Sequence, residues 1–183
     1  MPAKHPTLFR GRVISLTQER VRLPNGHEAE LEIVHHPGGA AVVALDQTGQ
    51  VCLLRQYRYA TGGWLWELPA GKIDNEEPPA QTARRELVEE AGREAADWRD
   101  LGCMHSSPGI FTEVVYLYLA QNLTPVGLGH EQEEVIEIHW LPLSQALEWC
   151  LDGTISDAKT LIGLFRAWAL LAKEPENCDP IRD

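Results

Sequence analysis

The sequence has 183 residues, 44% of them hydrophobic and 23% charged, which predicts one globular domain with a sizeable core. Its 27 acidic and 16 basic residues give a formal net charge of -11, which argues against nonspecific binding to nucleic acids and anionic membranes. No apolar run approaches the roughly 20 residues of a transmembrane helix, and the N-terminus lacks the apolar core of a signal peptide. The negative net charge is still compatible with a small anionic substrate, because binding such a substrate needs only a local basic pocket and metal ions.

The four cysteines predict neither a zinc site nor a disulfide framework, since no two of them form a CxxC pair. Cys52, Cys103 and Cys150 lie in apolar segments, where we expect them to pack as small hydrophobic residues. This cysteine usage fits a reducing compartment, so we expect a cytoplasmic protein.

The N-terminal part of the chain is predicted to be an antiparallel strand meander. Residues 8–17, 19–23 and 28–36 have the composition of strands, and Pro24-Asn25-Gly26 is a strong turn signal between the last two.

The strand pattern of the meander is interrupted by Gly38-Gly39. We interpret His35 and His36 as a strand end, although imidazoles can also bind ligands. The sequence shows no repeat and no second large domain, so three parts are expected: the meander 1–38, the main domain 39–173 and a loose tail 174–183.

Two apolar strands are predicted at 40–45 and 51–57, and the second runs into the polar sequence RQYR, which ends at Arg58. The segment GGWLWELPAG follows. Its Trp64 and Trp66 point the same way if they lie on a strand. They either stack on a nucleobase, which is worth about 1–3 kcal/mol, or pack in the core or a dimer interface.

A helix is predicted at 79–91, because Pro79 suits a first helical turn and Gly92 is the preferred residue just past a last turn. At about 100° per residue, Ala80, Ala83, Leu87 and Ala91 form a narrow stripe of small residues that lets the helix pack close to a sheet.

The same helix gathers three carboxylates on a neighbouring face, those of Glu86, Glu89 and Glu90. Like charges at this spacing repel, and anions near a helix C-terminus oppose the macrodipole. A hard divalent cation such as Mg²⁺ or Mn²⁺ would reverse both effects, since it takes oxygen ligands. The alternative is a solvated Glu-rich face.

Strands are predicted at 98–104, 114–120 and 135–141, and helices at 144–151 and 157–172. Ser144 and Ser156 are the expected N-caps of these two helices, and an apolar stripe that includes Trp168 is expected to cover the sheet. Residues 121–130 are expected to be a Gly-rich loop.

The spacing of Gly71, Glu77, the sequence REL at 85–87, Glu89-Glu90 and Gly92 resembles the Nudix box of the Nudix hydrolases. Arg93 departs from the family pattern, which usually has an aliphatic residue there. The resemblance implies an α/β fold, the Nudix α/β/α sandwich with a mixed sheet. It also implies metal ligands: Glu86 and Glu90, with Glu89 adding to the site, the carbonyl oxygen of Ala70, and Glu77 in support.

Three further segments resemble the ADP-ribose pyrophosphatases within that family: the QYR sequence, ELPAG before the box, and SPG with Pro108 sixteen residues after Gly92. The resemblance implies that Arg58 contacts the substrate's phosphates. Arg85 is expected to orient and neutralise the box carboxylates through charge-assisted hydrogen bonds. Further substrate-binding candidates are Glu67, which could accept from a base amino group or a ribose hydroxyl, and Trp66, Pro108 and Glu113. A loop glutamate is implied as catalytic base, in the order Glu133, Glu134, Glu131.

The resemblance implies metal-dependent hydrolysis of a nucleoside diphosphate sugar, with ADP-ribose giving AMP and ribose 5-phosphate, and a homodimer built through the N-terminal strands. One alternative is the same chemistry on another nucleotide sugar, such as GDP-mannose. Another is a nucleotide-binding Nudix-like domain without catalysis. Degenerate members of that kind lose box glutamates, whereas Glu77, Glu86, Glu89 and Glu90 are all present here.

Overall fold

Strand β4 (Gly39–Ala44) lies at the centre of the main body in the computed structural model, which describes residues 6–127 and 135–173. It pairs in parallel with β9 (Val114–Pro125) and antiparallel with β7 (Ala70–Lys72), and β8 (Arg93–His105) completes this sheet in the order β7-β4-β9-β8. The predicted mixed sheet is therefore confirmed.

A second sheet is antiparallel and has the order β10-β5-β6. Its strands are β5 (Gln50–Arg58), β6 (Gly63–Glu67) and β10 (Ile136–Pro142), with a 3-10 turn at Tyr59–Thr61 between β5 and β6. The three helices that pack on the two sheets within the described residues are α1 (Pro79–Ala91), α2 (Leu143–Asp152) and α3 (Ala158–Leu171).

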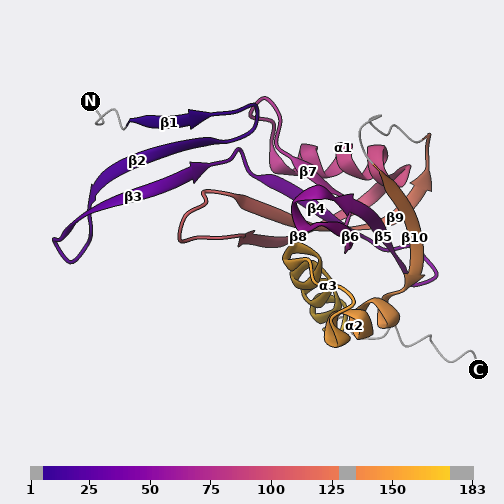
Figure 1. Ribbon diagram of the computed structural model, residues 1–183. Helices are drawn as coiled ribbons and strands as arrows, with labels where there is room; N and C mark the ends of the chain where they lie inside the picture. The colour runs from indigo at the N-terminus through magenta and orange to yellow at the C-terminus, as the bar shows by residue number, and fades with distance from the viewer. Residues whose placement is uncertain (1–5, 128–134, 174–183) are drawn as a thin grey trace, which may run out of the picture.

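The alternation of side chains along β4 divides the core in two. Ala40, Val42 and Ala44 face the cluster that contains α1, whereas Ala41 and Val43 face the cluster that contains α3. All five are buried, as expected for a strand covered on both faces. Figure 1 shows α1 on one side of the sheets and α2 and α3 on the other, which is the expected α/β/α arrangement.

Helix α1 has the predicted bounds, and Gly92 ends it with a left-handed φ of 59°. Ala83, Leu87 and Ala91 are buried against the sheet, but Ala80 is exposed, so the small-residue stripe is shorter than predicted.

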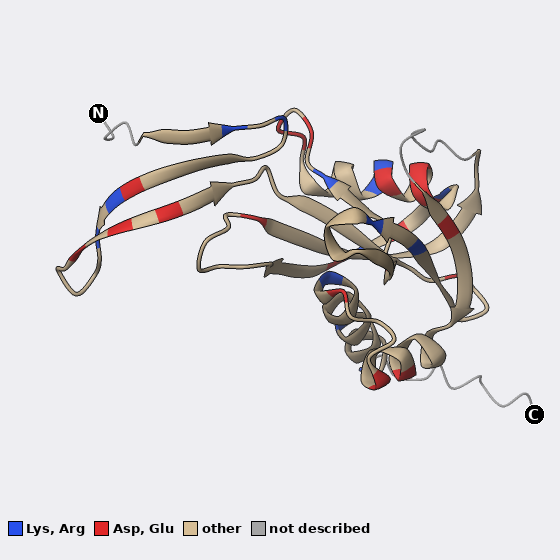
Figure 2. Cartoon of the chain, in the orientation of Figure 1, with Lys and Arg blue, Asp and Glu red and all other residues tan. Residues whose placement is uncertain are grey.

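The N-terminal strands form an arm that extends away from the body (Figure 1). They are β1 (Thr7–Arg10), β2 (Ser15–Arg22) and β3 (Glu28–His35), in an antiparallel sheet. The predicted strand 8–17 is wrong in its extent, because Gly11 donates to Ile14 in a turn between β1 and β2. Charged residues gather on the outer part of this arm (Figure 2). There Arg20 and Arg22 of β2 lie opposite Glu30 and Glu28 of β3, and Arg20 and Glu30 form an ion pair.

Other elements differ from prediction at their ends. The expected loop at 121–130 is wrong in its first part, because β9 continues to Pro125, whose partner is Arg93 at the start of β8. Asp157, not Ser156, caps α3 by accepting from the Thr160 N–H, and Trp168 is half exposed. The tail 174–183 lies outside the described residues. No helix among those described is long and apolar enough to span a membrane.

Candidate active site

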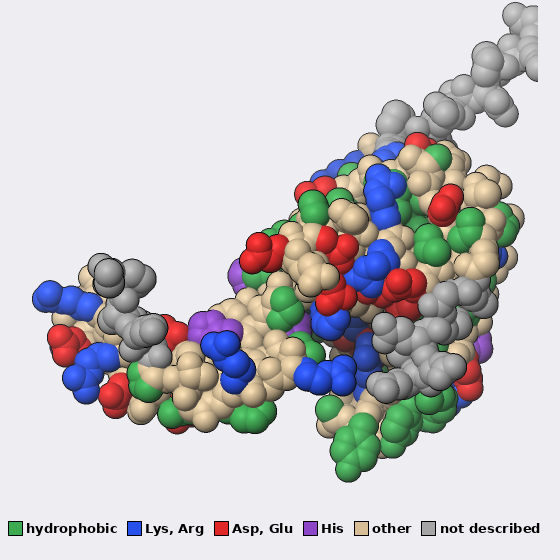
Figure 3. Space-filling view, turned by 90° about the horizontal axis from the view of Figure 1, so that it is seen from above, with side chains coloured by type: hydrophobic (Ala, Val, Ile, Leu, Met, Phe, Trp, Pro, Cys, Tyr) green, Lys and Arg blue, Asp and Glu red, His purple; other side chains and the backbone are tan. Residues whose placement is uncertain are grey.

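A cavity of about 450 Å³ lies where the inner end of the arm meets β4, β7, α1 and the start of α3. Its walls carry both signs of charge, and Figure 3 shows acidic and basic side chains gathered around a hollow beside the arm. The charged residues that line it are Arg58, Lys72, Asp74, Arg85, Glu86, Glu89, Glu113, Asp157 and Lys159. A site with this lining is suited to a polar ligand.

Gly71 lies directly beside the carboxylate of Glu86 in the cavity wall. A Cβ built on Gly71 would lie 1.9 Å from Oε1 of Glu86, so only glycine leaves room for this carboxylate against β7. Glu86 is itself buried at 7% exposure. The predicted loop glycine is therefore needed because the carboxylate of Glu86 on α1 occupies the space that a side chain at position 71 would fill.

Arg85 links the carboxylates of the site through charge-assisted hydrogen bonds, as expected. Its guanidinium donates to Glu86 at 2.6 Å, to Glu89 at 2.9 Å and to Glu77 at 2.9 Å. Partial burial alone would lower the pKa of Arg85, but the Glu77 hydrogen bond and the nearby glutamates raise it above its usual value. Arg85 therefore remains a cation that offsets the repulsion between these glutamates.

Glu90 is buried at 2% exposure and accepts from the Ala70 backbone N–H at 2.7 Å. This bond ties the C-terminal half of α1 to the start of β7. Glu77 accepts from Arg85 and from the Thr82 hydroxyl, and the Arg85 bond chiefly holds the pKa of Glu77 below its usual value. Glu77 and Glu90 do not line the cavity within the part of the chain that is described, whereas Ala70, Glu86 and Glu89 do.

The carboxylates of Glu86 and Glu89 fit Mg²⁺ or Mn²⁺, because hard divalent cations prefer carboxylate oxygens and both side chains line the cavity. Across the described ranges 6–127 and 135–173, no three His, Cys, Asp or Glu side chains converge into a preformed metal cluster. Instead, the carboxylates of Glu86 and Glu89 share Arg85. Roles as metal ligands therefore stay predictions for Ala70, Glu77, Glu86, Glu89 and Glu90.

Arg58 reaches the cavity from the end of β5, as expected, but Glu67 takes a different position from the one predicted. Arg58 donates to both carboxylate oxygens of Glu67, at 2.8 and 3.0 Å, and Lys159 donates to Glu67 as well. Glu67 is 2% exposed and is absent from the cavity lining among the described residues. Its oxygens therefore face two cations and not an approaching base or ribose.

Trp66 lies in an aromatic cluster outside the cavity lining. Its ring centroid is 5.0 Å from that of Trp149 on α2 and 4.9 Å from that of His139 on β10. Trp64, on the same face of β6, packs against Tyr57 and Arg55 and is 40% exposed. We therefore correct the placement of Trp66 from a possible nucleobase contact to the edge of the core.

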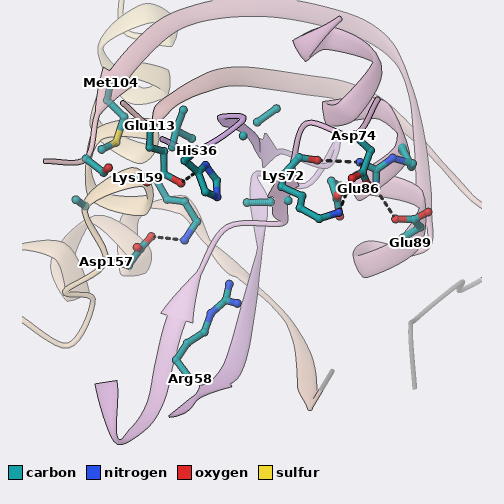
Figure 4. Close-up of a pocket in the computed structure, with 18 residues that line it drawn as sticks. His36, Arg58, Lys72, Asp74, Glu86, Glu89, Met104, Glu113, Asp157 and Lys159 are labelled. Carbon is teal, nitrogen blue, oxygen red and sulfur yellow. Dashed lines mark hydrogen bonds and ion pairs between the residues drawn. The ribbon is translucent and has the colours of Figure 1, made fainter. Parts of the chain in front are cut away.

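Glu113 lines the cavity and lies 3.3 Å from Nδ1 of His36, which also lines it (Figure 4). Interpreting His36 as only a strand end was therefore incomplete. Pro108 is not part of the described lining, but Ser106 of the same turn is. The candidate bases Glu131, Glu133 and Glu134 lie outside the described residues.

Sequence reasoning also missed Lys72, Asp157 and Lys159 in the cavity lining. The N-cap position of Asp157 marks where α3 begins, but no local signal shows that this helix start docks beside Arg58. Arg93, the departure from the box, donates to Gly92 and stacks over Trp140 at 5.3 Å, so it packs after the helix without touching the acidic face.

Carboxylates of α1 share one cavity with Arg58 and Lys159 on an α/β/α scaffold, an arrangement that is compatible with a class of hydrolases that act on phosphorylated substrates. The chain belongs to the Nudix family, since the NUDIX domain model matches residues 35–162.

The relatives of the chain agree with this assignment. It is 38% identical over 167 residues to the ADP-ribose pyrophosphatase of Mycobacterium tuberculosis, which covers 90% of this chain and 81% of that protein. It is 40% identical over 142 residues to the GDP-mannose pyrophosphatase of Klebsiella pneumoniae, which covers 72% of this chain and 71% of that protein. A crystal structure of an ADP compounds hydrolase has the same fold, with a TM-score of 0.78, 24% identity and 91% of each chain covered.

Proposed function

We propose that this protein hydrolyses the diphosphate linkage of a nucleoside diphosphate sugar, with ADP-ribose as its preferred substrate and AMP and ribose 5-phosphate as products. The observation that carries the proposal is the cavity in which Glu86 and Glu89 of α1 share one space with Arg58 and Lys159. The relative from Mycobacterium tuberculosis, named an ADP-ribose pyrophosphatase, supports ADP-ribose as the sugar nucleotide.

The chemistry requires that the negative charge of two phosphates be neutralised before a nucleophile can approach. A Mg²⁺ or Mn²⁺ ion held by Glu86, Glu89 and Glu90, with the Ala70 carbonyl, would act as a Lewis acid and lower the pKa of bound water. Arg85 holds the glutamates in place, and Glu77 supports Arg85. Arg58 binds a phosphate oxygen.

The base that accepts the proton of the attacking water is proposed to be Glu133, or else Glu134 or Glu131. The proposal rests on the resemblance to ADP-ribose pyrophosphatases, in which a glutamate of the corresponding loop can take this role. Glu113 is proposed to contact the substrate, since it lines the cavity beside His36.

GDP-mannose is the second candidate substrate, and the relative from Klebsiella pneumoniae supports it. The mechanism would be unchanged, because both substrates present the same diphosphate to the same residues. Only the contacts to the base and the sugar would differ.

We also propose a homodimer formed through residues 1–38. The arm exposes Leu8, Phe9 and Val13, which are 53%, 55% and 43% exposed, and a second copy would cover such apolar side chains. A cytoplasmic location is proposed from the cysteine usage.

A phosphate-release panel tests the proposed function. Purified protein with Mg²⁺ and alkaline phosphatase is offered ADP-ribose, GDP-mannose, UDP-glucose, NADH and diadenosine polyphosphates. Because alkaline phosphatase attacks the terminal phosphate of 8-oxo-dGTP directly, that compound is tested with inorganic pyrophosphatase instead. Preference for ADP-ribose supports the proposal, and preference for GDP-mannose moves it to the second candidate. No turnover of any of them would favour a binding domain without catalysis.

A further inference from the structure

Two cations from distant parts of the chain meet on one buried carboxylate at the wall of the cavity. Arg58 comes from the end of β5 and Lys159 from the first turn of α3, and both donate to Glu67 at the end of β6. Figure 4 shows Arg58 and Lys159 pointing into the cavity from different elements. Glu67 therefore sets the distance between two groups that face the same space.

Lys159 is held from its other side as well. Its Nζ donates to Asp157 at 3.0 Å, and Asp157 accepts from the N–H and the hydroxyl of Thr160. The Thr160 hydroxyl in turn accepts from the Leu68 N–H at 2.9 Å, next to Glu67. These hydrogen bonds connect the start of α3 to the end of β6, and they restrict the position of the Lys159 ammonium group.

Both cations keep donors for a ligand after these bonds are made. A guanidinium carries five N–H donors and an ammonium three. Arg58 uses two of them on Glu67, and Lys159 uses one on Glu67 and one on Asp157. Both residues line the cavity, so the remaining donors are available there at fixed positions.

The formal charges of the four groups cancel, since Arg58 and Lys159 face Glu67 and Asp157. The cluster has no net charge with which to attract anions in general. It can bind a ligand because its hydrogen-bond donors are already held in position. Phosphate oxygens match such donors, because charge-assisted hydrogen bonds to them are strong.

We propose that Lys159 binds a phosphate oxygen of the substrate beside Arg58, and that Glu67 is the positioning residue that holds both cations at one spacing. The inference rests on the proposed function and extends it, since it adds a phosphate contact from α3 and removes Glu67 from direct contact with substrate.

The first test compares Lys159→Met with Lys173→Met, the same substitution at an exposed position just past the end of α3. Binding of inorganic pyrophosphate in saturating Mg²⁺, measured by calorimetry, should weaken about tenfold in the first variant, as for loss of one charge-assisted hydrogen bond. The second variant should match wild type, and Lys159→Arg should bind more tightly than Lys159→Met. Equal affinity of Lys159→Met and wild type would overturn the phosphate contact.

The second test is a double-mutant cycle between Glu67→Gln and Lys159→Met, with kcat and KM measured on ADP-ribose and folding checked by circular dichroism. If Glu67 acts through Lys159 and Arg58, Glu67→Gln should lower kcat/KM about tenfold in wild type but distinctly less when Lys159 is already Met. Independent effects would remove the positioning role. Should wild type not hydrolyse ADP-ribose, the proposed function fails, while the pyrophosphate measurement still decides the inference about Lys159.

Discussion

The backbone N–H of Ala70 donates a 2.7 Å hydrogen bond to the carboxylate of Glu90, twenty residues further along the chain. This bond joins β7, which leads out of the ELPAG segment, to the last turns of α1. It explains how a buried carboxylate is tolerated close to a helix C-terminus, where the macrodipole disfavours it. It also brings the Glu90 side chain to the residue whose carbonyl is proposed to face the metal.

Glu90→Gln should lower turnover of ADP-ribose by about a hundredfold or more, because it removes an anionic oxygen from the proposed metal face. The fold should persist, since an amide oxygen can still accept from Ala70. Steady-state kinetics measure the turnover, and a thermal melt measures the stability of the fold. Glu94→Gln, on the exposed part of β8, is the matched control and should behave as wild type. Unchanged turnover in Glu90→Gln would remove Glu90 from the site.

Gly71→Ala should lower kcat by about a hundredfold, since displacing the Glu86 carboxylate by about 1 Å is enough for such a loss. The clash is with the end of a flexible side chain, so the protein should still fold. Gly63→Ala is the control, because a Cβ there meets no atom within 4 Å. Equal activity of the two variants would show that the close approach of Gly71 to Glu86 is not needed.

Divalent metal should stabilise the fold, because it offsets the repulsion among Glu86, Glu89 and Glu90. At about 100 times its dissociation constant a ligand adds about 2.7 kcal/mol, which corresponds to a rise in Tm of about 5–10 °C for a chain of this size. Melting curves with Mg²⁺, Mn²⁺ and EDTA test this. Curves that coincide in all three conditions would speak against a metal site in the free protein.

Stability should depend on pH through Glu67. Burial alone would raise the pKa of this carboxyl, but the hydrogen bonds and charges of Arg58 and Lys159 hold it below its usual 4.5. A lowered folded-state pKa contributes stability that is present above pH 4.5 and is lost as pH falls through the folded value. Denaturant unfolding at pH 7 to 3 should therefore show the advantage of wild type over Glu67→Gln shrinking only below about pH 4.5. A constant difference would contradict the ion cluster.

Cysteine reactivity should follow burial. Desolvation raises the pKa of the Cys52 thiol to about 12, so it should resist alkylation at pH 8 in the folded protein. Cys103 is exposed, contrary to its expected packing, and should react readily. Peptide-level mass spectrometry after iodoacetamide treatment measures the extent of alkylation at both cysteines. Fast labelling of Cys52 in native protein would mean that β5 opens more easily than its buried position allows.

The parts of the fold that sequence predicts well are those governed by local rules. Pro79 and Gly92 bound α1 at the predicted residues because both act through their own backbone. The arm was less predictable, since the turn after β1 depends on pairing with β2 that composition does not reveal. The extension of β9 to Pro125 likewise depends on its partner β8.

The candidate site divides in the same way. Glu86, Glu89 and Arg85 come together because they lie within about one turn of one helix, which periodicity shows. Lys159 and Arg58 are 101 residues apart in the sequence and come together only because α3 docks at the end of β6. No local pattern in the sequence marks such a pair. For this reason Glu67 was predicted to contact the substrate, whereas its carboxylate oxygens accept hydrogen bonds from these two cations.

Cleavage of the diphosphate can be followed by ³¹P NMR of ADP-ribose incubated with the protein and Mg²⁺, with and without excess EDTA. We expect the diphosphate resonances to be replaced by two phosphomonoester resonances of equal intensity, those of AMP and ribose 5-phosphate, and we expect EDTA to abolish the change. Diphosphate resonances that persist while ADP-ribose is bound, or hydrolysis that continues unchanged in EDTA, would contradict the proposed metal-dependent cleavage.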